Sequence, residues 1–111
     1  MTVADIRRRK QAERLKGLHQ QASLVLAEHP GGSLWLFGSR ARGDWDAFSD
    51  VDLLAIAPNR SQASELADAV LDLGMADDVL ALTELEWQER RNGDDPYWSA
   101  IGRDALRLSQ P

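Results

Sequence analysis

Residues 33–57 read SLWLFGSRARGDWDAFSDVDLLAIA, and this stretch decides the fold. Residues 34–37 are consecutive apolar residues that follow a Pro-Gly-Gly turn signal, which predicts a short strand buried on both faces. Gly38 ends that strand. A second strand is predicted over Asp50–Ala57, where alternation points Asp50, Asp52 and every second residue after them to one side of the sheet.

The flanking segments carry helical periodicity and helix-capping signals, together with one further apolar strand pattern. Helices are predicted at about Ala4 to Glu28, Ser61 to Leu73, Thr83 to Asn92 and Pro96 to Leu108, and a third strand at Asp78 to Leu82. An extended tail at the end of the last helix is left open as an alternative. The predicted fold class is therefore α+β, a small mixed β-sheet with helices packed on one face. Residues 1–111 are expected to form one domain, with an N-terminal helix (1–29), a sheet core (33–83) and C-terminal helices (84–111).

Composition excludes several classes of protein. The 111 residues include 13 Lys plus Arg, 18 Asp plus Glu and no Cys, giving a formal net charge of −5. The absence of Cys excludes a disulfide scaffold, a Cys-ligated zinc site and thiol catalysis. The acidic balance argues against stable nucleic-acid binding, so the cluster Arg7–Lys10 is read as a solvated helix face, with RNA or an acidic partner as the alternative.

A cytoplasmic location is expected because the absence of Cys fits a reducing compartment, and no membrane association is expected. No apolar run approaches the roughly 18–20 residues that a membrane span requires. The first residues form no apolar signal segment, because a run of basic side chains leads into a mixed polar stretch.

His19 and His29 have no partner ligand or nucleophile at a useful spacing, so both are expected to be surface or helix-end residues.

The two ends of the 38–52 segment carry the residue types of a phosphate and metal site. Gly38 allows a sharp turn with close approach of a ligand, and Ser39 opens a possible helix whose free amides and hydroxyl could hold phosphate oxygens. Asp50 and Asp52 stand two apart on a strand, so both point to one face about 6.6–7 Å apart at the backbone. Hard carboxylate oxygens suit Mg²⁺, and a pair of such ions supports in-line phosphoryl displacement.

The stretch GSRARGDWDAFSDVDLLAI, from Gly38 to Ile56, resembles the nucleotidyltransferase superfamily related to DNA polymerase beta. More narrowly, it is similar to the minimal nucleotidyltransferase (MNT) domains that are paired with HEPN-domain toxins. The resemblance carries Gly38, Ser39, Asp50 and Asp52 onto the family's Gly-Ser and Asp-x-Asp motifs. It implies the minimal form of the nucleotidyltransferase fold, ATP as substrate and two Mg²⁺ ions as cofactors.

The resemblance also implies a third carboxylate on a neighbouring strand, which would bind metal and act as general base. Asp78 fits best and Asp77 is the competitor, because a shift of one residue would exchange their faces. Arg40 and Arg42 follow the Gly-Ser bend; they either pair with the triphosphate or form ordinary surface ion pairs.

In function, the resemblance implies an antitoxin that transfers AMP to a tyrosine of its partner, a HEPN ribonuclease toxin, within a hetero-oligomer. Two alternatives stay open at this point. The chain could silence the toxin by occlusion without transfer, or it could be a stand-alone small-molecule nucleotidyltransferase. Larger members of the superfamily add a second domain that binds the acceptor. Because the resemblance here covers the catalytic core alone, the acceptor is expected to come from another molecule.

Overall fold

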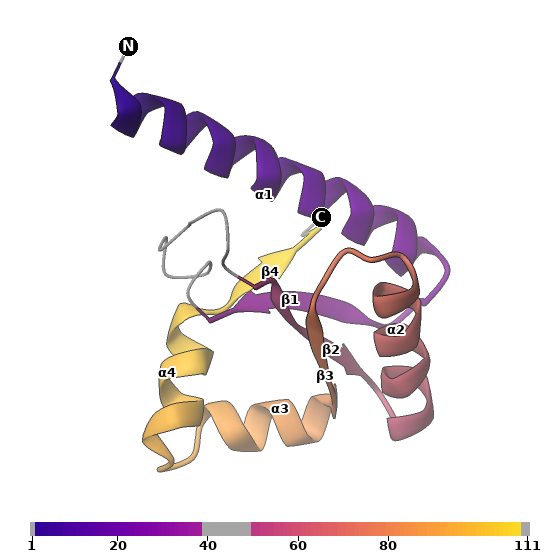
Figure 1. Ribbon diagram of the computed structural model, residues 1–111. Coiled ribbons are helices and arrows are strands. Elements are labelled where there is room, and N and C mark those ends of the chain that lie inside the picture. Colours follow the sequence, from indigo (N-terminus) through magenta and orange to yellow (C-terminus); the bar gives the residue numbers. More distant parts are fainter. Residues whose placement is uncertain (1, 39–49, 110–111) are drawn as a thin grey trace.

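The computed structural model describes residues 2–38 and 50–109, which form four helices and four strands (Figure 1). In chain order these are α1 (Val3–Ala27), β1 (Ser33–Phe37), β2 (Asp52–Ala57), α2 (Arg60–Asp72), β3 (Asp78–Thr83), α3 (Glu84–Arg91), α4 (Pro96–Asp104) and β4 (Leu106–Leu108). The α+β class, the mixed sheet and the three predicted strands are confirmed. None of the described helices is both long and apolar enough to cross a bilayer.

The sheet has the strand order β3-β2-β1-β4. β1 lies antiparallel to both β2 and β4, whereas β2 and β3 run parallel. The parallel pair needs the crossover through α2, whose start is capped by Asn59, with the side-chain oxygen accepting a hydrogen bond from the backbone N–H of Gln62 at 2.9 Å. This strand order and direction bring the end of β1 and the beginnings of β2 and β3 together at one end of the sheet.

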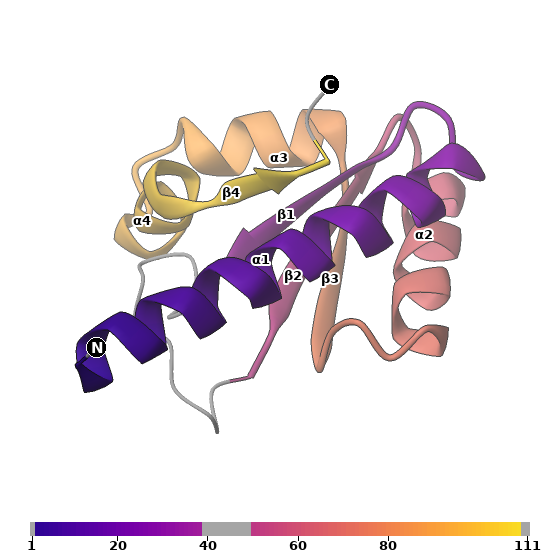
Figure 2. The same ribbon diagram turned by 90° about the horizontal axis from the view of Figure 1, so that it is seen from above.

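Helices cover both faces of the sheet, which corrects the prediction of helices on one face. Alternate residues of β1 divide between two hydrophobic clusters: Leu34 and Leu36 pack with α1 and α2, whereas Trp35 and Phe37 pack on the side of α3 and α4. Figure 2 shows the sheet between these two helical layers. The run of consecutive apolar residues in β1 requires this arrangement, because a strand presents every second side chain to the opposite face.

The C-terminal region is the second correction, because its predicted helix ends at Asp104 and residues 106–108 form β4. β4 pairs with the otherwise open edge of β1, and Leu108 becomes fully buried against the layer of α1 and α2. The backbone N–H of Ser109 then donates to His19 Nδ1 at 2.8 Å. His19 is thus partly buried and holds the end of β4 to α1, a structural role that its sequence context did not indicate.

Stacked arginine and tryptophan side chains join α3 to the sheet. The Arg91 guanidinium lies 4.9 Å from the ring centroid of Trp87 and 5.4 Å from that of Trp35. The two tryptophan rings are themselves 5.5 Å apart. Cation–π contacts of this kind contribute roughly 0.5–2 kcal/mol each, more where water is excluded. They fix the layer of α3 and α4 on the face of the sheet that also carries the acidic residues described next.

Candidate functional site

Gly38 terminates β1 in a conformation that only glycine adopts without strain. Its φ is +81°, in the left-handed region. A Cβ placed on this residue would lie 3.0 Å from Oδ2 of Asp52, closer than ordinary packing allows. The glycine therefore permits both the turn and the close approach of the Asp52 carboxylate to the backbone, which fits its predicted place in a ligand-binding bend.

Asp52 and Asp78 lie side by side at the starts of two parallel strands. Asp52 opposes Phe37 of β1 on one side and Asp78 of β3 on the other. Residues in register across a sheet point to the same face. Both carboxylates therefore occupy one face of the sheet, beside the bend at Gly38. β2 begins at Asp52, two residues later than predicted, so Asp50 precedes the strand.

Asp77 has a different position, although it is adjacent to Asp78 in the chain. One of its carboxylate oxygens accepts a hydrogen bond from the backbone N–H of Val51 at 2.7 Å. Its own backbone N–H donates to the carbonyl of Val51 at 2.9 Å. The side chain of Asp78 forms no such bond among the described residues. The geometry thus places Asp78 beside Asp52, whereas Asp77 ties the start of β3 to the residue before β2.

The electrostatic environment of Asp52 is unfavourable for its own charge. Partial burial is the main cause that raises the pKa of Asp52 above its ordinary value of 3.8, and the charges of Asp78, Asp50 and Asp77 raise it further in that order. Such an accumulation of carboxylates is costly without a cation. Perturbed carboxylates of this kind occur preferentially at functional sites.

The carboxylates fit a divalent cation in chemistry and in proximity, but they are not converged on one point. Residues 2–38 and 50–109 contain no group of three or more acidic or histidine side chains arranged to hold a metal ion. Asp50, Asp52 and Asp78 offer the hard oxygen ligands that Mg²⁺ prefers, with its remaining positions left for water and phosphate. Ser39, Arg40 and Arg42 lie outside the described residues, so their predicted phosphate contacts remain predictions.

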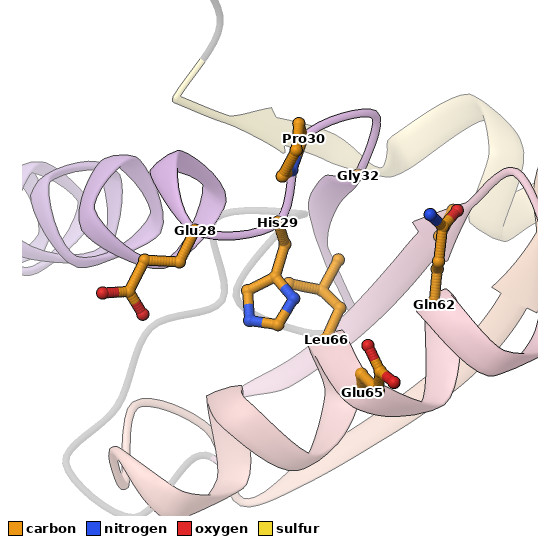
Figure 3. Close-up of a pocket in the computed structure, with 8 residues that line it drawn as sticks. Glu28, His29, Pro30, Gly32, Gln62, Glu65 and Leu66 are labelled. Carbon is orange, nitrogen blue, oxygen red and sulfur yellow. The ribbon is translucent and has the colours of Figure 1, made fainter.

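A cavity of about 180 Å³ lies elsewhere, where α1 ends and α2 begins (Figure 3). Glu28, His29, Gln62 and Glu65 contribute its polar lining. It also contacts Ala57, the last residue of β2, whereas the acidic group gathers around the first residue of that strand. Five residues of extended strand separate these positions by roughly 17 Å. The cavity is therefore distinct from the candidate site.

Comparison with known proteins agrees with this geometry. The model of the nucleotidyltransferase domain family matches residues 9–95. A crystal structure of a Sulfolobus solfataricus protein assigned as a nucleotidyltransferase is similar, with a TM-score of 0.58 and 21% sequence identity over 91% of this chain and 84% of that chain. At that identity the likeness shows the fold. Comparison with curated proteins found no match. Because the family match spans most of the sequence, the chain belongs to the nucleotidyltransferase domain family.

Proposed function

We propose that this nucleotidyltransferase transfers AMP from ATP to a tyrosine hydroxyl of a HEPN ribonuclease toxin and thereby acts as its antitoxin in the cytoplasm. The observation that carries the transferase chemistry is the row formed by the Gly38 bend, Asp52 and Asp78 on one sheet face. The antitoxin role is supported by the similarity of residues 38–56 to the MNT pattern. The toxin would be bound in a hetero-oligomer.

Each residue of the proposed site has a chemical task. Asp50, Asp52 and Asp78 would hold two Mg²⁺ ions, which supply charge stabilisation for the attacking and leaving oxygens when bound. Gly38 leaves the backbone open to the nucleotide phosphates. Ser39, together with Arg40 and Arg42, would hold the triphosphate through a hydroxyl and two guanidinium groups.

The proposed reaction is an in-line displacement at the α-phosphorus. The tyrosine oxygen forms a bond to that phosphorus, the bond to the bridging oxygen of the β-phosphate breaks, and pyrophosphate leaves. Asp78 accepts the hydroxyl proton as general base. The raised pKa of Asp52 makes the fully ionised, cation-binding state less accessible at acidic pH. Transfer is therefore expected to fail as the pH falls through that pKa.

The test uses the purified chain, ATP, MgCl₂ and the HEPN toxin proposed as its partner. Intact mass spectrometry should show one adenylyl group added to the toxin, and ribonuclease activity should fall in parallel. Asp52→Asn should abolish the mass increase, whereas Asp68→Asn, an exposed carboxyl on α2, should not. An unmodified toxin in the presence of folded chain would reject the transferase proposal.

The same experiment separates the two alternatives. The carboxylates of the described residues are not converged in a metal-binding group, which is the observation that keeps silencing by occlusion as a second candidate. If a variant with Asp50→Asn and Asp52→Asn still neutralises the toxin, binding alone is sufficient. Adenylylation of a small acceptor without any partner protein would instead indicate a stand-alone transferase.

A further inference from the structure

The first part of α1 carries a charge opposite to that of the chain. Residues 3–17, which we term the basic arm, contain six basic and two acidic side chains. The arm therefore has a net charge of +4, whereas the chain as a whole has −5 and the residues outside the arm have −9. The basic residues of the arm are Arg7, Arg8, Arg9, Lys10, Arg14 and Lys16, all exposed.

The basic arm stands out from the body of the protein. In Figures 1 and 2, α1 runs diagonally across the sheet and its first half extends past the side where β1 ends. Residues 3–10 are all exposed, and the first buried residue of α1 is Leu18. The second half of the helix packs on the core through Leu18, Ala22 and Val25, while within the arm only Leu15, close to its end, packs against that cluster.

The start of the arm is nevertheless well defined. Thr2 and Asp5 form a capping box, in which the Asp5 backbone N–H donates to the Thr2 hydroxyl at 3.2 Å and the Asp5 carboxylate accepts from the Thr2 backbone N–H at 3.1 Å. These hydrogen bonds lower the pKa of Asp5. Because residues 3–10 are capped, helical and exposed, this part of the arm presents its charges away from the acidic body.

The positive charges are distributed around the whole circumference of the basic arm. Arg7, Arg8, Arg9 and Lys10 are consecutive, and four residues exceed one helical turn of about 3.6 residues. The arm is thus positive on every side at this level. A partner that lies against one face of a helix would contact only part of this ring, whereas a groove with phosphates on both walls would contact cations on two opposite sides of the helix.

We propose that the basic arm binds the major groove of duplex DNA. A helix with its side chains is about 10–12 Å across, and the major groove of B-DNA is about 12 Å wide. The major groove of A-form RNA is deep and narrow and admits such a helix less well. Arginine, which predominates among the arm's cations, also binds phosphate oxygens through two parallel N–H donors.

A second copy of the arm is a poor occupant. The outward positions at heptad spacing after Val3 and Ile6 are Lys10, Glu13 and Gly17, so no apolar seam runs along the arm. The net negative charge of the chain does not oppose the proposal. It is an average over all residues, whereas the cations of the arm lie on the projecting half of α1 and the excess of acidic residues lies in the rest of the protein. The proposal is independent of the transferase function.

The test measures binding of the full chain to a fluorescein-labelled 20-base-pair DNA duplex by anisotropy across a salt series. With about five phosphate contacts, the logarithm of the binding constant should fall against the logarithm of salt with a slope of about −4.5. Replacing Arg8, Arg9 and Lys10 together by Gln should reduce the steepness by about 2.7 and weaken binding at least about tenfold at low salt. Gln sustains helix, so circular dichroism should stay unchanged.

Matched controls assign the effect to the charges of the arm. The exchange Arg8→Lys with Arg9→Lys retains charge and should keep the salt slope. Arg103→Gln removes an exposed cation outside the arm and should leave binding unchanged. The proposal is overturned if the wild-type chain does not bind DNA at low salt, or if the triple Gln variant binds equally. Equal or tighter binding to polyglutamate or to an RNA duplex would also overturn it, in favour of an acidic protein or of RNA.

Discussion

Replacing Asp52 with Asn should make the protein more stable while it removes the proposed activity. Asp52 is partly buried, stands in register with Asp78 and has a raised pKa. Among the described residues its carboxylate makes no hydrogen bond or ion pair that Asn would lose. The substitution removes a partly buried negative charge and its repulsions and keeps nearly the same side-chain volume, so the folded state becomes more stable.

The magnitude follows from Coulomb's law. Two carboxylates on neighbouring strands lie about 6 Å apart, and their repulsion is about 0.7 kcal/mol in a fully aqueous dielectric. Partial burial lowers the effective dielectric constant, whereas solvent at Asp78 screens the pair. A gain of about 1 kcal/mol is therefore expected. For a domain of this size that corresponds to a rise in Tm of roughly 4 °C.

The raised pKa of Asp52 also determines how the stability difference between the variant and the wild type changes with pH. A raised carboxyl pKa means that the folded state resists ionisation, so the wild type is penalised above that pKa and not below the ordinary value of 3.8. The advantage of Asp52→Asn should be full at neutral pH and should disappear as the pH falls through the raised pKa toward 3.8. Thermal unfolding followed by circular dichroism at pH 7, 5 and 3.5 measures it.

Asp68→Asn is the control, because Asp68 is exposed on α2 and its neutralisation should change stability by less than about 0.5 kcal/mol. Added MgCl₂ should raise the Tm of the wild type and of this control but not that of Asp52→Asn. An Asp52→Asn protein that is no more stable than the control at pH 7 would refute the reasoning. So would an advantage that persists unchanged at pH 3.5.

Four further substitutions examine the bend, the acidic pair and the Arg–Trp stack. Gly38→Ala should destabilise by about 1 kcal/mol more than Gly74→Ala in urea unfolding, because the cost of a left-handed Cβ is common to both and only Gly38 would press a Cβ on a carboxylate; equal losses would contradict the clash. Asp77→Ala should lower unfolding free energy by about 0.5–1.5 kcal/mol, whereas Asp78→Asn should abolish transfer with stability unchanged or raised; the reverse pattern would exchange their roles. Arg91→Met should lower the free energy of unfolding by about 1–2 kcal/mol, because the guanidinium contacts with Trp35 and Trp87 are lost. An unchanged free energy of unfolding would show that these contacts do not stabilise the fold.

The sequence predicted the sheet core well, because its signals there are local. The apolar run of β1 and the alternation of β2 are properties of single strands. The same run in β1 also required cover on both faces, so the expectation of helices on one face conflicted with the pattern itself. β4 could not be predicted in this way, since Leu106–Leu108 has three residues and becomes a strand only because the edge of β1 is open.

The choice between Asp77 and Asp78 depended on a contact between distant segments, which periodicity cannot supply. The two residues are chemically identical and adjacent, yet Asp78 begins β3 and Asp77 precedes it, so their side chains have different neighbours. The Asp77 carboxylate accepts from the Val51 amide at 2.7 Å and thereby holds the start of β3 against the residue that precedes β2. That register is what brings Asp78 beside Asp52. The acid that binds no ligand in the proposed mechanism therefore positions the one that does, and it offsets through a hydrogen bond part of the repulsion that the cluster creates.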